Sequence, residues 1–144
     1  MDYASAFENI NFLAILFAAL SSFVVGGFWY SKSMFLKIWM KETGLTQKDI
    51  EKKQGMAQIF TATFLLALVA AYFLAVVLYM VSEPKANWLD GAVFGAVVGM
   101  AFVATSQATH VLFERKTLRL FAVQSGHDIL RLAVMGAILG AFGS

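Results

Sequence analysis

Four long apolar segments constrain this chain more than any other feature of its sequence. They cover about residues 10–30, 56–81, 89–113 and 118–142, and each has at least the roughly 20 residues that a helix needs to cross a bilayer. Only 14% of the residues are charged, against about 25% in a typical soluble domain. We therefore predict an all-α membrane protein in which residues 1–144 form a single transmembrane domain, a bundle of four helices.

Four polar residues lie inside the fourth apolar segment, and we call them the polar quartet: Gln124, His127, Asp128 and Arg131. At 100° per residue, their side chains fall within about 100° of one another, so they share one helix face. The thirteen residues that follow Arg131 are fewer than the ~17 that a span requires. Either the polar quartet lies within the membrane or the segment is re-entrant, and we expect the first. Ionisable side chains within a membrane face protein or water and mark functional sites.

Basic residues are concentrated in two of the three predicted loops. Nine of the eleven lie there: Lys32, Lys37, Lys41, Lys48, Lys52 and Lys53 at the first loop, and Arg115, Lys116 and Arg119 at the third. Loops rich in lysine and arginine stay in the cytoplasm. We therefore predict that both termini lie outside the cytoplasm.

The first loop has the pattern of an ordered segment. Trp29 and Tyr30 follow the first apolar run, at the level where aromatic belts form. Apolar residues then recur at helical spacing as far as Trp39, while Lys37 and Lys41 share another face. The pattern predicts a short helix in the headgroup layer of this cytoplasmic loop, with Trp29, Tyr30 and Trp39 at the membrane interface.

Two short patterns mark the ends of the predicted helices. Thr46 and Asp49 have the spacing of a capping box, which predicts that the second long helix begins in the cytoplasm. In the second loop, Pro84 and Asn87 favour a tight turn on the outer side.

Small residues repeat along the third and fourth segments at the spacing of a helix face: Gly91, Gly95 and Gly99 in the third, and Gly136 and Gly140 in the fourth. In lipid, helices associate through such faces because small side chains let backbones approach closely. The pairing is either within one chain or between copies, and the spacing does not decide which helices meet. Because four short helices hardly enclose a transport path alone, we also expect a homo-oligomer.

Polar residues within the predicted spans gather in the cytoplasmic half: Gln58, Thr61 and Thr63 in the second span, Gln107 and His110 in the third, and the polar quartet in the fourth. This distribution predicts a polar pocket that opens to the cytoplasm, with Gln107 and His110 across from the polar quartet. Arg131 would supply a fixed positive charge for a small ion or an anionic solute, and His127 a group that titrates near neutral pH.

Several classes of function lack support in this sequence. The absence of cysteine removes disulfides, iron–sulfur clusters and thiolate catalysis, and no hydrolase, kinase or dinucleotide motif is present. His110 and His127 lie at unequal depth, which is weak support for haem or a metal. We therefore expect no cofactor, no metal and no enzyme activity, and the net charge of +2 does not favour nucleic acid as a partner.

Motifs near both ends of the chain resemble those of a known family. Gly26-Gly27-Phe28-Trp29-Tyr30-Ser31, followed by Phe35, Lys37, Trp39 and Gly44, resembles the signature of the bacterial family catalogued as domain of unknown function 1761. Phe113-Glu114, Gly126 and the run from Gly136 to Gly140 are similar to its second half, although His127 stands where that family often has an aromatic residue. The resemblance implies a small four-helix bacterial membrane protein and supplies no activity. We expect this chain in the inner membrane.

Two functional hypotheses come before a third, an enzyme, which would need a cofactor that the sequence does not show. The first is a small transport-type or solute-binding protein whose site is the polar quartet. The second is a structural or accessory membrane subunit. In that case the pairing of Asp128 with Arg131 only orders the helices, and the region from Trp29 to Trp39 docks a partner or lipid headgroups.

Overall fold

A computed structural model describes residues 3–52, 55–82 and 85–143 of the chain, and all regular structure in these ranges is helical. The prediction of an all-α fold is therefore confirmed for this part of the chain. In chain order the elements are α1 (Tyr3–Glu8), α2 (Phe12–Trp29), α3 (Leu36–Thr43), α4 (Gln47–Glu51), α5 (Met56–Val81), α6 (Trp88–Val98), the π-helix η1 (Gly99–Ala104), α7 (Thr105–Phe113) and α8 (Leu118–Ala141).

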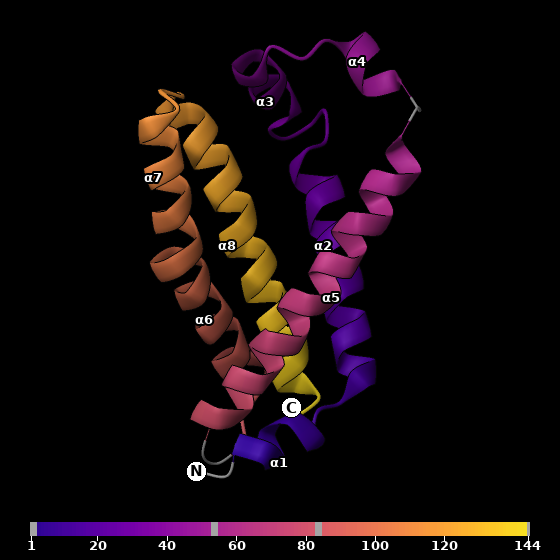
Figure 1. The fold of residues 1–144 in the computed structure, drawn as a ribbon, viewed down its shortest axis with the longest axis vertical. Helices are drawn as coiled ribbons and strands as arrows, with labels where there is room; N and C mark the ends of the chain where they lie inside the picture. The colour runs from indigo at the N-terminus through magenta and orange to yellow at the C-terminus, as the bar shows by residue number, and fades with distance from the viewer. Residues whose placement is uncertain (1–2, 53–54, 83–84, 144) are drawn as a thin grey trace.

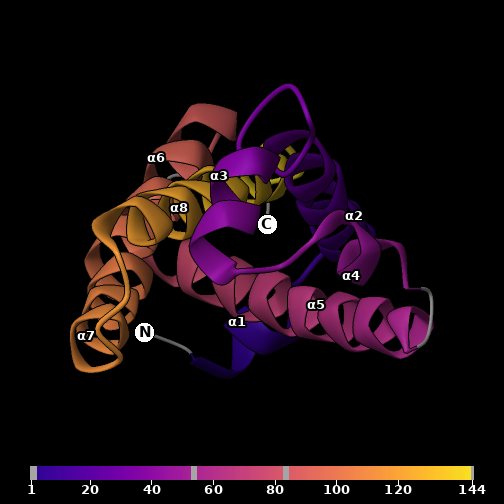
Figure 2. The same cartoon turned by 90° about the horizontal axis from the view of Figure 1, so that it is seen from above.

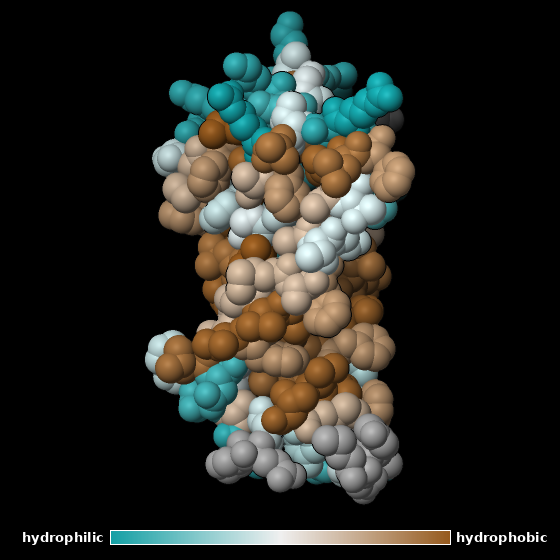
Figure 3. Space-filling view, turned by 90° about the vertical axis from the view of Figure 1, so that its left-hand side faces the viewer, coloured by the Kyte–Doolittle hydropathy of each residue, from teal (hydrophilic) through white to brown (hydrophobic). Residues whose placement is uncertain are grey.

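Three helical stretches in the described residues are long and apolar enough to cross a membrane: α2, α5, and the continuous run of α6, η1 and α7 over Trp88–Phe113. The chain is therefore a helical membrane protein. Figure 3 shows a wide band of hydrophobic side chains below a hydrophilic cap on one face of the molecule. The fourth predicted span, α8, has 24 residues but contains Asp128 and Arg131, and it is not among the three.

The long helices form two pairs (Figure 1). The run from α6 to α7 lies antiparallel beside α8, and α2 lies beside α5. Helix α8 joins the pairs because it also packs against α2 and α5. Helix α5 diverges from α8 towards the end that carries α3 and α4 (Figures 1 and 2), whereas α2 stays in contact with α8 there through Trp29 and Val123. The buried core lies nearer the other end, where small residues of α2 and α5 surround large side chains of α8: Ala14, Ala18, Ala71, Ala75, Met135 and Leu139.

The two glycine stripes face each other within one chain. A Cβ atom on Gly91 would overlap the backbone carbonyl of Gly136, and one on Gly95 would overlap the carbonyl of Leu132. A Cβ on Gly99 would lie 2.9 Å from the Cα of Ile129. The glycines thus bring the backbones of α6 and α8 into contact, which answers the question of pairing. Because these glycines are buried in a contact within one chain, they no longer support self-association between copies.

The helix starts follow local capping. Asn11 accepts backbone hydrogen bonds at the start of α2. Asn87 and Asp90 form a capping box at the start of α6. We had predicted Asn87 in a tight turn with Pro84, and Pro84 lies outside the described residues. The capping box of Thr46 and Asp49 is present, but it begins the five-residue helix α4. The expectation that it starts the second long helix is therefore wrong, because α5 begins separately at Met56.

The π-helix η1 changes which face of α7 meets α8. Gln107 follows Gly99 by eight residues, so in an unbroken α-helix it would lie about 80° away from the face of Gly99. A π-turn contains about one residue more than an α-turn and delays the helix by about 100°. Gln107 is thereby returned to within about 20° of the face of Gly99 and contacts α8.

Candidate functional site

Asp128 of α8 lies at the centre of a cluster of polar side chains. Its Oδ2 atom accepts a hydrogen bond of 2.5 Å from Nε2 of Gln107 on α7. Its Oδ1 atom lies 3.2 Å from Nδ1 of His127 and 3.4 Å from Nε of Arg131. Between 16% and 23% of each of these three α8 side chains is exposed. The carboxylate is therefore surrounded by donors from two helices in a mostly buried position.

Ser125 completes the contact with α7. Its hydroxyl donates a hydrogen bond of 2.7 Å to Oε1 of Gln107. The amide of Gln107 therefore accepts a hydrogen bond from Ser125 and donates one to Asp128, three residues further along α8. Only 4% of Ser125 is exposed. The sequence interpretation missed this residue. Its spacing of three residues before Asp128 was the available signal, since that spacing brings two side chains to neighbouring positions on a helix.

His127 lies on the opposite side of the cluster, against α2. The centroids of the His127 and Tyr30 rings are 5.1 Å apart, and Tyr30 meets Trp39 edge-on at 5.8 Å. Nε2 of His127 points at Gly26 of α2, where a Cβ atom would lie 3.5 Å away. Tyr30 and Trp39, which we expected only at the membrane interface, are thus connected to the polar cluster.

Trp29 fixes the end of α2 to α8. Its indole Nε1 donates a hydrogen bond of 2.9 Å to the carbonyl of Val123, and its ring packs on Phe35 at 4.5 Å between centroids. A Cβ atom on Gly126 would lie 2.9 Å from Cζ2 of the indole. Gly126 therefore leaves the space that this ring occupies.

Two buried nitrogen atoms of the cluster have no hydrogen-bond partner among the described residues: Nε2 of His127 and Nε of Arg131. Arg131 lies close enough to Asp128 for charge attraction, yet its Nε makes no hydrogen bond. Because Nε is buried, the exposed part of the Arg131 side chain lies on its other atoms. Buried polar groups without partners are costly, and more so in a membrane.

A comparison with known protein families covers the residues of this cluster. A family model described as "Protein of unknown function (DUF1761)" matches residues 13–140. The chain belongs to this family. The resemblance expected from the motifs is therefore confirmed, and the match includes the polar cluster and both glycine stripes of this DUF1761 chain. No curated protein and no solved structure matches it.

Two predicted site residues of this DUF1761 chain lie apart from the cluster. His110 is exposed on α7, and its side chain interacts electrostatically with Glu114. Gln124 is half-buried, and its side chain makes no hydrogen bond with any residue that the structure describes. His110 and His127 are thus not brought together, and the described residues contain no group of three or more metal-binding side chains.

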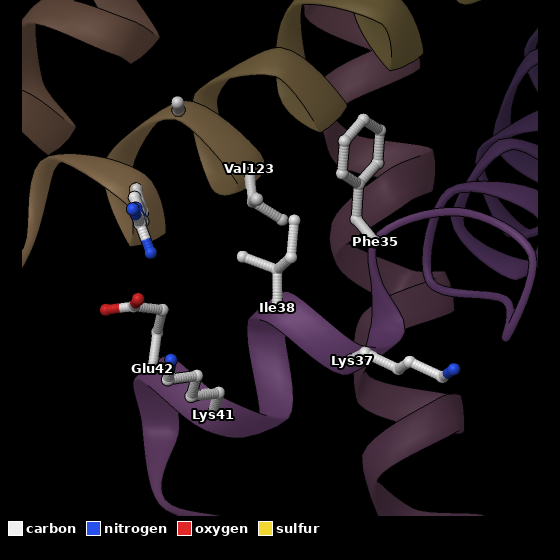
Figure 4. Close-up of a pocket in the computed structure, with 8 residues that line it drawn as sticks. Phe35, Lys37, Ile38, Lys41, Glu42 and Val123 are labelled. Carbon is white, nitrogen blue, oxygen red and sulfur yellow. The ribbon is translucent and has the colours of Figure 1, made fainter.

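A groove lies beside the cluster, between α3 and the first turns of α8 (Figure 4). It encloses about 480 Å³. Its lining contains no residue of the polar quartet and is formed by Phe35, Lys37, Ile38, Lys41, Glu42, Arg119, Ala122 and Val123. The helix predicted for the first loop is present as α3, and it packs against α8.

Proposed function

We propose that this chain is a small transport-type or solute-binding membrane protein that binds a small ion or an anionic solute at Arg131 and His127. One observation carries the proposal. Nε2 of His127 and Nε of Arg131 are buried, and neither has a hydrogen-bond partner among the described residues. Both atoms belong to side chains that can donate to an anion, so a bound ligand would satisfy them.

The neighbours of His127 connect anion binding at this site to the binding of a proton. The carboxylate of Asp128 faces Nδ1, which favours a proton on that nitrogen and leaves a lone pair on Nε2 of the neutral ring. Protonation turns Nε2 into a second donor. With Asp128 negative and Arg131 positive, the cluster is then neutral before protonation of His127 and carries +1 afterwards. Binding of an anion and binding of a proton therefore favour each other.

The proposal includes α8 as a fourth membrane span of one transmembrane domain. At 1.5 Å per residue its 24 residues reach about 36 Å, more than the ~30 Å hydrocarbon layer. Asp128 contacts Gln107 of α7, and His127 packs on Tyr30 at the end of α2, as expected for ionisable side chains inside a membrane, which face protein or water. The basic loops would lie in the cytoplasm and both termini outside it, in the inner membrane of a bacterium.

Proton uptake by reconstituted protein tests the proposal. Vesicles that contain the full chain and a pH-sensitive dye are supplied with chloride, phosphate or acetate under an inward anion gradient. We expect at least one anion to drive proton entry, and Arg131→Leu and His127→Gln to reduce it about tenfold or more. Arg115→Leu and His110→Gln make the same changes at exposed positions outside the cluster and should leave it unchanged. Uptake that is equal in Arg131→Leu and the unaltered chain would overturn the proposal, as would no uptake with any of the three anions.

A different observation favours the second candidate, an accessory subunit or homo-oligomer. The start of α5 is exposed over residues 57–63, including the amide of Gln58. Within the described part of the chain, the hydroxyl groups of Thr61 and Thr63 bond only to the carbonyls of Ala57 and Ile59 of their own helix. An amide side chain at the membrane level is better covered by another helix than by lipid. Cross-linking from the variant Gln58→Cys in native membranes should capture a second copy or a partner subunit, and capture of neither would count against this candidate.

A further inference from the structure

We propose that the groove between α3 and α8 binds an anionic phospholipid of the surrounding membrane. This goes beyond the proposed function, because the groove shares no residue with the polar cluster. It encloses about 480 Å³. In Figure 4, Ile38 and Val123 meet at its middle, with Lys37 on one side and Lys41 and Glu42 on the other.

The charges of the groove favour a negative headgroup. Lys37 and Lys41 of α3 and Arg119 of α8 line it and are exposed. The one acidic lining residue, Glu42, accepts a hydrogen bond from the hydroxyl of Thr117. The ionisable lining residues together carry a net charge of +2. Basic side chains on neighbouring helices at a membrane surface attract anionic lipid, at about 1 kcal/mol for each lysine or arginine.

The lining also has an apolar part, which a soluble anion would not use. Phe35 and Ile38 contribute from α3, and Ala122 and Val123 from α8. Lysine and arginine side chains can lay their aliphatic stems on such a surface while their charged ends reach the headgroup. A ligand that fits both parts has a negative group joined to a hydrocarbon chain.

The position of the groove selects lipid as the source of that ligand. It lies at the end of the bundle that carries α3 and α4, and the hydrophobic band of the surface gives way to hydrophilic side chains at this end (Figure 3). Trp29, directly before the loop to α3, packs on Phe35 of the groove. Lipid headgroups lie at this depth in a membrane. Free phosphate has no apolar part that could contact the apolar floor of the groove, which Phe35, Ile38, Ala122 and Val123 form.

Thermal unfolding of the full chain in mixed micelles tests the proposal. A small, fixed proportion of dioleoyl phosphatidylglycerol is expected to raise Tm by about 5 °C relative to the same amount of dioleoyl phosphatidylcholine. The triple variant Lys37→Gln, Lys41→Gln, Arg119→Gln should lose this rise. Ala122→Leu fills the floor while it keeps every charge, and it should lose most of the rise as well.

A matched triple variant removes the same charges outside the groove: Lys32→Gln, Lys48→Gln and Arg115→Gln, all exposed. It should keep the full rise in Tm. Equal losses in the two triple variants would overturn the proposal, because the effect would then be diffuse charge attraction. The same Tm in phosphatidylglycerol and phosphatidylcholine would overturn it too, as would an equal rise in Tm with inorganic phosphate alone.

Discussion

Gln107 of α7 donates a hydrogen bond of 2.5 Å to Asp128 of α8, across an interface that the π-helix η1 brings into register. The same amide accepts a hydrogen bond from Ser125. Gln107 therefore links a carboxylate and a hydroxyl that lie three residues apart on α8.

Replacement of Gln107 by leucine should destabilise the protein. The change leaves Asp128 without its donor from α7 and Ser125 without its acceptor, and buried polar groups that lose a partner cost about 1–3 kcal/mol each. Thermal unfolding in detergent measures the effect. Ser106→Ala alters the neighbouring residue, which is exposed, and should leave Tm within error. Similar unfolding temperatures for the two variants would show that the contact contributes little.

Two neighbouring glycines of α2 allow a matched test of access to His127. Gly26→Ala introduces a methyl group 3.5 Å from Nε2 of His127, an ordinary contact, whereas a Cβ on Gly27 meets nothing within 4 Å. Both changes should raise helix propensity by about 1 kcal/mol. We expect only Gly26→Ala to reduce anion-driven proton uptake in reconstituted vesicles, because its methyl group occupies the space in front of Nε2. The same rate in both variants would contradict a ligand or proton route at that atom.

Gly95→Ala should lower the free energy of unfolding. Its Cβ would overlap the backbone of Leu132, and backbone atoms cannot give way as a flexible side chain can. Forced shifts of this kind cost about 1–3 kcal/mol. Unfolding in a denaturing detergent, with Gly27→Ala as the control, measures the loss. An unchanged or more stable Gly95→Ala variant would mean that α6 and α8 are not in backbone contact.

The stability of the first turn of α4 should depend on pH. Hydrogen bonds from the side chain and backbone of Thr46 hold the pKa of the Asp49 carboxyl below its ordinary value, with a further contribution from Lys52. A group whose pKa is lowered by folding stabilises the folded form above its unfolded pKa, about 3.9, and loses that contribution as pH falls through the folded value. Hydrogen-exchange protection of the Asp49 amide, corrected for intrinsic rates, should therefore be constant from neutral pH down to about pH 4 and fall below it. In Asp49→Asn the protection should not vary with pH over this range.

Much of the fold was predictable because hydropathy is a property of each segment by itself. The predicted span 56–81 coincides with α5, Met56–Val81, and the predicted ends of the last two long segments differ from the structure by one residue. The shared face of His127, Asp128 and Arg131 also followed from helical periodicity. The π-helix did not, because nothing in the spacing of apolar residues marks an extra residue in one turn.

The sequence by itself determined a helical membrane protein with a polar face on its last helix and glycine stripes on the last two, because length, composition and period are local. Only the tertiary structure decided what each face meets. It joined Gly91 to Gly136, brought Tyr30 and Gly26 to His127, Gln107 to Asp128 and Trp29 to Gly126, and left His110 exposed. The physical reason is that periodicity gives the direction of a side chain from its own helix axis, whereas its neighbours depend on how closely separate helices approach, and small residues and backbone contacts set that approach.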